Sequence, residues 1–119
     1  MKVMLVEDDR TMRAILKTLL ELERFTVAAW NGQAGEDILA QIRAENPDVM
    51  LLDVHLRSAS GLDILRQTRA DNQISGMRIL MTSGMDLKDQ CLEAGADGFL
   101  LKPYMPDELI QLIRTQVSP

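Results

Sequence analysis

Residues 49–53 of this 119-residue chain read Val-Met-Leu-Leu-Asp, four apolar residues that run directly into a carboxylate. A continuous apolar run is typical of a central strand in a parallel sheet, because such a strand is buried on both faces. Three other short apolar runs also end in polar groups suited to phosphoryl chemistry: residues 3–6 lead to Glu7, residues 79–81 to Thr82, and residues 99–101 to Lys102. Carboxyl ends of parallel strands share one edge of a sheet, so we expect these side chains to converge there.

The rest of the chain alternates between strand-like and helix-like patterns. Apolar residues recur at helical spacing across residues 11–23, for example. The patterns predict strands at 2–6, 25–29, 48–52, 77–82 and 97–101. They predict helices at 11–23 and 33–44, after Ser60, between Asp86 and Gly95, and from Pro106 onward. These βα units predict an α/β three-layer sandwich with right-handed crossovers.

Turn and cap residues set the expected boundaries. A turn is expected at Asn31-Gly32, and Asn46-Pro47 ends the helix before it, since proline cannot continue a helix. Ser60-Gly61-Leu62-Asp63 resembles a capping box, and Asp86 is expected to cap the fourth helix. Pro106 suits the first position of the last helix.

Size and composition narrow the class of protein. The 119 residues, 46% of them hydrophobic and 26% charged, predict a single globular domain over residues 1–119. A net charge of −5 argues against direct binding to nucleic acid or to an anionic membrane. No apolar run approaches the roughly 18 residues that a membrane helix needs, and the N-terminus does not resemble a signal peptide. The single cysteine, Cys91, fits a reducing compartment, and we expect a cytoplasmic protein.

The expected cluster of side chains suits transfer of a phosphoryl group. Asp53 is the candidate nucleophile, because a carboxylate can attack phosphorus to form an aspartyl phosphate. Phosphate and carboxylates repel each other, so the reaction needs a cation. Glu7 and Asp8 offer the oxygen ligands that Mg²⁺ prefers. Lys102 would neutralise phosphoryl oxygens, and the Thr82 hydroxyl would donate a hydrogen bond to one of them.

Each of these residues alone also has a structural explanation. An acidic pair after a strand is often a solvated loop, and Asp is common where a strand turns into a loop. Threonine is ordinary in strands. The functional interpretation therefore depends on the joint occurrence of these groups at the ends of successive strands.

The chain resembles the receiver domain of two-component response regulators, the family that includes the bacterial chemotaxis regulator. The resemblance covers essentially the whole chain. The matching segments are Val6-Glu7-Asp8-Asp9, Leu51-Leu52-Asp53, Gly61, Met81-Thr82-Ser83, Ala94-Gly95-Ala96-Asp97-Gly98 and Lys102-Pro103. The resemblance implies a flavodoxin-like (βα)5 doubly wound fold with parallel sheet order 2-1-3-4-5.

The resemblance also assigns roles to individual residues. Asp53 falls on the phosphoacceptor position, and Glu7 and Asp8 fall on the positions that bind magnesium. The backbone carbonyl of His55 would complete the metal ligands. Thr82 falls on the switch hydroxyl, Phe99 on the switch aromatic residue and Lys102 on the family's lysine, and a cis Lys102–Pro103 bond is implied. Asp9 lies one place beyond the metal-binding pair and is expected to cap the first helix.

One loop departs from the family pattern. The family commonly has Met-Pro three and four residues after the phosphoacceptor, whereas this chain has Leu56-Arg57. Arg57 places a cation near the site, which leaves the lifetime of a phosphorylated form open. His55, the only histidine, is either a solvated loop residue or a group that affects the water that hydrolyses the aspartyl phosphate.

The resemblance implies a phosphorylation switch. A histidine kinase or a phosphotransfer protein would supply the phosphoryl group in a Mg²⁺-dependent reaction. The surface of the last two helices and the strand between them would then change and contact a downstream effector domain or protein. The same surface would serve a homodimer. The chain would dephosphorylate itself but turn over no separate substrate.

Three other functions fit the sequence less well. A phosphatase of the haloacid-dehalogenase type would want a second Asp two residues after the nucleophile, where this chain has His55. A flavodoxin-like cofactor binder would need a phosphate-cradling loop after the first strand, where acids stand instead. A receiver-like interaction domain that is never phosphorylated would not need Asp53, Thr82 and Lys102 together.

Overall fold

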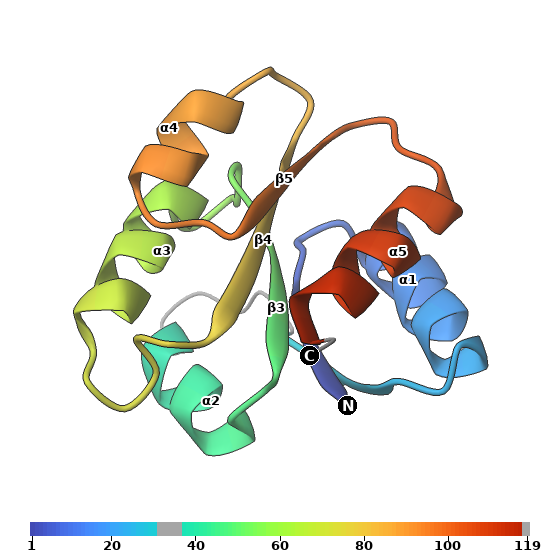
Figure 1. Ribbon diagram of the computed structural model, residues 1–119, viewed down its shortest axis with the longest axis horizontal. Helices are drawn as coiled ribbons and strands as arrows, with labels where there is room; N and C mark the ends of the chain where they lie inside the picture. The colour runs from blue at the N-terminus through green and yellow to red at the C-terminus, as the bar shows by residue number, and fades with distance from the viewer. Residues whose placement is uncertain (31–36, 118–119) are drawn as a thin grey trace.

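The computed structural model describes residues 1–30 and 37–117, which form five strands and five helices in strict alternation (Figure 1). The strands are β1 (Lys2–Val6), β2 (Thr26–Ala29), β3 (Val49–Asp53), β4 (Arg78–Ser83) and β5 (Gly98–Leu101). The helices are α1 (Arg10–Leu22), α2 (Ile38–Glu45), α3 (Gly61–Ala70), α4 (Lys88–Glu93) and α5 (Pro106–Val117). All neighbouring strands pair in parallel, in the order β2-β1-β3-β4-β5. The predicted flavodoxin-like fold and strand order are confirmed.

The sheet is the middle of three layers, and β3 is its central strand. Figure 1 shows α1 and α5 on one face of the sheet and α2, α3 and α4 on the other. Successive side chains of a strand point to opposite faces, so β3 divides its residues between two cores. Met50 and Leu52 join the cluster that includes residues of α2, α3 and α4, whereas Val49 and Leu51 join the cluster that includes residues of α1 and α5. This double burial explains the unbroken apolar run that precedes Asp53.

Helix starts agree with the sequence in some places and differ in others. Asp9 is the N-cap of α1 and its carboxylate accepts a hydrogen bond from the Met12 N–H at 2.9 Å, as predicted. Pro106 is the first residue of α5, also as predicted. The helix predicted over 33–44 is described only from Asp37, which is the N-cap of a helix that begins at Ile38. Residues 33–36 of that prediction and the predicted turn at Asn31-Gly32 lie outside the described residues.

Two predicted caps are wrong. Ser60 is the N-cap of α3, but its side chain makes no capping hydrogen bond, so the predicted capping box does not form. Instead, the N–H of Gly61 donates to the carbonyl of Val54 at 2.7 Å and ties the start of α3 to the end of β3. Leu87 is the N-cap of α4, and the Asp86 carboxylate only receives a long 3.4 Å bond from the Lys88 N–H. At the start of α3, the backbone hydrogen bond from Gly61 takes the place of a side-chain cap.

Candidate functional site

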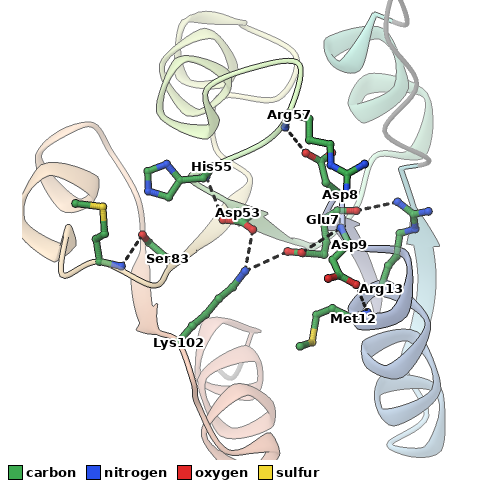
Figure 2. Close-up of polar contacts among 11 residues, drawn as sticks. Glu7, Asp8, Asp9, Met12, Arg13, Asp53, His55, Arg57, Ser83 and Lys102 are labelled. Atoms are coloured by element: carbon green, nitrogen blue, oxygen red, sulfur yellow. Dashed lines mark hydrogen bonds and ion pairs between the residues drawn. The ribbon is translucent and has the colours of Figure 1, made fainter.

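Three charged side chains meet at the carboxyl edge of the sheet. Glu7 directly follows β1, Asp53 is the last residue of β3, and Lys102 directly follows β5. The Lys102 ammonium lies 2.8 Å from an oxygen of Asp53 and 3.4 Å from an oxygen of Glu7 (Figure 2). Both carboxylate side chains are about nine-tenths buried, whereas the lysine is 29% exposed. The parallel sheet thus brings together groups that lie up to 95 residues apart in sequence.

Each of the three acids near this edge also accepts a hydrogen bond from a backbone amide. Asp53 accepts from the N–H of His55 at 3.1 Å, and Glu7 accepts from the N–H of Asp9 at 3.3 Å. Asp8 accepts from the N–H of Arg57. These amides partly compensate the concentration of negative charge, because a hydrogen bond to the ionised form of a carboxylate stabilises it.

Arg13 of α1 contacts the loop between β1 and α1, which carries Glu7 and Asp8. Its guanidinium donates to the backbone carbonyl of Glu7 at 2.8 Å. Sequence reasoning missed this residue. Its place one helical turn after the N-cap Asp9 is the signal that could have indicated it, because residues four apart lie on the same side of a helix.

The electrostatics of the site favour an added cation. Burial, together with the neighbouring Asp53, raises the pKa of Glu7 to about 7 against the opposing effect of Lys102. Burial alone would lower the pKa of Lys102, but its contacts with Asp53 and Glu7 raise it overall. Burial and the two negative carboxylates raise the pKa of Tyr104 to about 12. The Lys102 ammonium therefore opposes the rise in the pKa of Glu7 but does not cancel it.

The raised pKa of Glu7 predicts a specific pH dependence of stability. Between about pH 4.5 and about pH 7 the folded protein holds more protons than the unfolded chain, so the free energy of unfolding falls as pH rises. We expect the decrease, up to about 1 kcal/mol per pH unit, to be weakened in Glu7→Gln when chemical unfolding is measured without magnesium. The exposed Glu21 near the other end of α1 provides the control, and Glu21→Gln should leave the slope unchanged. Equal slopes in the wild type and Glu7→Gln would contradict the raised pKa.

The oxygen-only donor set of Glu7, Asp8 and Asp53 fits magnesium, which takes one or two carboxylates and keeps several waters. Within the described parts of the chain, no group of three or more His, Cys, Asp or Glu side chains is arranged to hold a metal. In Figure 2 the Asp8 carboxylate points to the loop that carries Arg57, while Glu7 and Asp53 share Lys102. The side chain of His55 is exposed, and this residue forms an isolated antiparallel bridge with Ser60.

The remaining predicted residues lie on the two strands next to β3. Thr82 of β4 is buried and stands beside Asp53 in the strand register. Phe99 of β5 is half-buried, stands beside Met81 and packs against the core cluster on the side of α2, α3 and α4. Ser83, which follows Thr82, is buried, and its carbonyl accepts a 2.8 Å hydrogen bond from the Lys102 N–H. That bond fixes the backbone of Lys102 to β4. The Lys102–Pro103 peptide bond is cis.

Residues 3–114 match the family of response regulator receiver domains, and the chain belongs to that family. It is 33% identical over 116 residues to the chemotaxis protein CheY of Pseudomonas aeruginosa, which covers 95% of this chain and 93% of that protein. It is 37% identical over 118 residues to a nitrate/nitrite response regulator protein homolog of Haemophilus influenzae, which covers 96% of this chain. The chain spans 55% of the length of that second relative.

Solved structures share the same architecture. The signal receiver domain of a response regulator from Bermanella marisrubri has a TM-score of 0.88 at 29% identity and covers 98% of both chains. The BeF3-activated N-terminal receiver domain of RstA from Klebsiella pneumoniae has a TM-score of 0.84 at 25% identity over the full length of both chains. None of the helices within residues 1–30 and 37–117 is long and apolar enough to cross a membrane.

Proposed function

We propose that this receiver domain is a phosphorylation switch with Asp53 as the phosphoacceptor. The observation that carries the proposal is the buried ion-pair cluster at the sheet edge, in which the Asp53 carboxylate lies 2.8 Å from the Lys102 ammonium and close to Glu7. A carboxylate in that position can act as a nucleophile while the lysine stabilises negative charge on the incoming group. Family membership supports the same assignment.

The phosphoryl donor is a phosphohistidine on a histidine kinase or a phosphotransfer protein. An oxygen of Asp53 attacks phosphorus, the P–N bond of the phosphohistidine breaks, and the leaving imidazole takes up a proton. Lys102 pairs with the phosphoryl oxygens, and the Thr82 hydroxyl donates a hydrogen bond to one of them. Hydrolysis of the aspartyl phosphate then restores the carboxylate, so the domain turns over no separate substrate.

Magnesium belongs to this proposal as a cofactor, held by Glu7, Asp8, Asp53 and the backbone carbonyl of His55. When bound, it supplies the positive charge that lets a phosphoryl group approach the carboxylates. The protein positions these acids at the ends of two neighbouring strands: Glu7 and Asp8 follow β1, and Asp53 ends β3. The placement of Glu7 and Asp53 on either side of Lys102 supports the cofactor, because two carboxylates there share one ammonium.

The response to phosphorylation runs through β4 and β5. Movement of Thr82 toward the phosphoryl group frees space into which Phe99 turns, and the surface of α4, β5 and α5 changes as a result. That surface contacts a downstream effector domain or protein, and it also serves a homodimer. The exposed apolar side chains of Leu92 and Leu101, 40% and 49% accessible, support contacts there. The domain works in the cytoplasm and binds neither nucleic acid nor membrane directly.

Removing the ammonium of Lys102 should destabilise the metal-free domain and make it depend on magnesium. In Lys102→Met the apolar stem is kept, but Glu7 and Asp53 lose the cation between them. We expect the free energy of unfolding to fall by about 2 kcal/mol, because breaking a largely buried ion pair leaves uncompensated charge. Saturating Mg²⁺ should restore more stability in this variant than in the wild type. Lys88→Met on the exposed side of α4 is the matched control, and a magnesium response equal in all three proteins would contradict the prediction.

The direct test of the function is labelling with acetyl phosphate, a small phosphoryl donor. Intact-protein mass spectrometry should show the addition of a single phosphoryl group in the presence of Mg²⁺ and none after chelation of the metal. Addition of several phosphoryl groups, or labelling that persists after chelation of the metal, would argue against a single metal-dependent site.

A further inference from the structure

Asp8 does not share the ion-pair cluster formed by its neighbours. Lys102 contacts Glu7 and Asp53, whereas the Asp8 carboxylate turns toward the loop between β3 and α3 (Figure 2). Asp8 is half-buried, so water and ions reach it more easily than they reach Glu7. Asp8, a proposed metal ligand, is therefore hydrogen-bonded to a different partner in this structure.

That partner is the backbone N–H of Arg57, 49 residues away in sequence. Asp53 and Glu7 each accept a hydrogen bond from the amide two positions later in the same loop. The amide that serves Asp8 instead joins two separate loops, the one after β1 and the one after β3. A hydrogen bond from an amide to an ionised carboxylate is among the stronger kinds.

The loop after β3 is tied at its base and exposed at its tip. The base is closed by the bridge between His55 and Ser60 and by the hydrogen bond from Gly61 to Val54 at 2.7 Å. Arg57 lies between these ties and is exposed. The Asp8–Arg57 contact is separate from these ties, so its loss breaks neither of them.

We propose that the backbone amide of Arg57 holds Asp8 away from the metal site, and that magnesium binding breaks this Asp8–Arg57 contact. The inference rests on the proposed function, because it assumes that magnesium binds beside Asp53. The contact lowers magnesium affinity, since part of the binding free energy is used to release Asp8. It also couples metal binding to the position of the loop that borders the phosphoacceptor.

A pair of variants at one position isolates the amide. Arg57→Ala removes the guanidinium but keeps the N–H, whereas Arg57→Pro removes both, because proline has no backbone N–H. Comparing the two cancels the effect of the lost positive charge. Titration calorimetry of the full chain with MgCl₂ should give a dissociation constant about tenfold lower for Arg57→Pro than for Arg57→Ala. Circular dichroism checks that both variants are folded.

A second measurement needs no substitution and remains available if the proline variant does not fold. In the metal-free wild type, NMR should show the Arg57 amide proton shifted downfield and protected from exchange with solvent. Saturating Mg²⁺ should remove the downfield shift and speed the exchange. The Ile79 amide is the internal reference, because its acceptor is the carboxylate of Asp97, which is not among the proposed metal ligands.

The outcomes separate the inference from the function on which it rests. If Arg57→Pro binds Mg²⁺ no more tightly than Arg57→Ala, or the Arg57 amide stays protected in the metal-bound wild type, the contact orients Asp8 as a ligand and the inference is overturned. In that case Mg²⁺-dependent labelling by acetyl phosphate still occurs. If wild type and both variants neither bind Mg²⁺ nor become labelled, the proposed function fails together with the inference.

Discussion

Asp53→Asn should remove labelling by acetyl phosphate and Mg²⁺ entirely, leaving a signal no higher than that of the chelated control. The substitution keeps the shape of the side chain but replaces the carboxylate nucleophile by an amide, which does not form a stable acyl phosphate. No other acid is expected to substitute, because Glu7 and Asp8 are the proposed metal ligands under these conditions.

The loss of labelling should not be caused by unfolding. Asp53 raises the pKa of Glu7, so neutralising it relieves repulsion, and Lys102 keeps Glu7 as a partner. We therefore expect the thermal midpoint of Asp53→Asn to equal or exceed that of the wild type. Asp63→Asn on the exposed start of α3 is the control and should be labelled normally. Persistent labelling of folded Asp53→Asn would show that the acceptor is a different residue.

Gly61→Ala should be the most destabilising small substitution in the loop after β3. A Cβ at position 61 would lie 2.1 Å from the carbonyl oxygen of Asp53 and 2.8 Å from the Cα of Val54. Both are backbone atoms of the segment that carries the phosphoacceptor, so no side chain can move aside. Overpacking usually costs about 1–3 kcal/mol and occasionally more. We expect about 3 kcal/mol here, together with weaker labelling because Asp53 itself must shift.

Gly76→Ala is the matched control for that prediction. A Cβ at position 76 would meet no atom within 4 Å, and this glycine is not among those with positive φ. Its free energy of unfolding should stay within about 0.5 kcal/mol of the wild type. Urea unfolding of the three proteins measures the difference. Equal stability of Gly61→Ala and Gly76→Ala would show that the close approach of α3 to β3 is not needed for the fold.

Sequence reasoning predicted the sheet because the signal there is strong. An apolar run such as residues 49–52 is explained by burial on both faces of a central strand, and the structure confirms the sheet and its strand order. Charged groups at strand ends could be assigned to one edge of the sheet, because the carboxyl ends of parallel strands lie together there. Convergence of Glu7, Asp53 and Lys102 follows from parallel topology rather than from any local preference.

The features that sequence reasoning missed depend on contacts between loops. The missing cap at Ser60 reflects the backbone bond from Gly61 to Val54, which no side-chain pattern reports. The turn of Asp8 toward the Arg57 amide likewise involves a backbone donor, whose position depends on the folded loop.

Arg69 is a third example of a contact that sequence reasoning missed. It joins α3 to the carbonyl of Gly95 and to the carboxylate of Asp97, each at 2.8 Å. Partners 26 and 28 residues away cannot be read from one sequence.

The most direct measurement is to locate the phosphoryl group itself. Wild-type protein is treated with acetyl phosphate and Mg²⁺, the acyl phosphate is reduced with borohydride, and the peptides are sequenced by mass spectrometry. The account predicts that the reduced side chain, homoserine, is found at position 53 and that chelation of the metal prevents its formation. Reduction at Glu7, Asp8 or any other acid, with Asp53 intact, would contradict it.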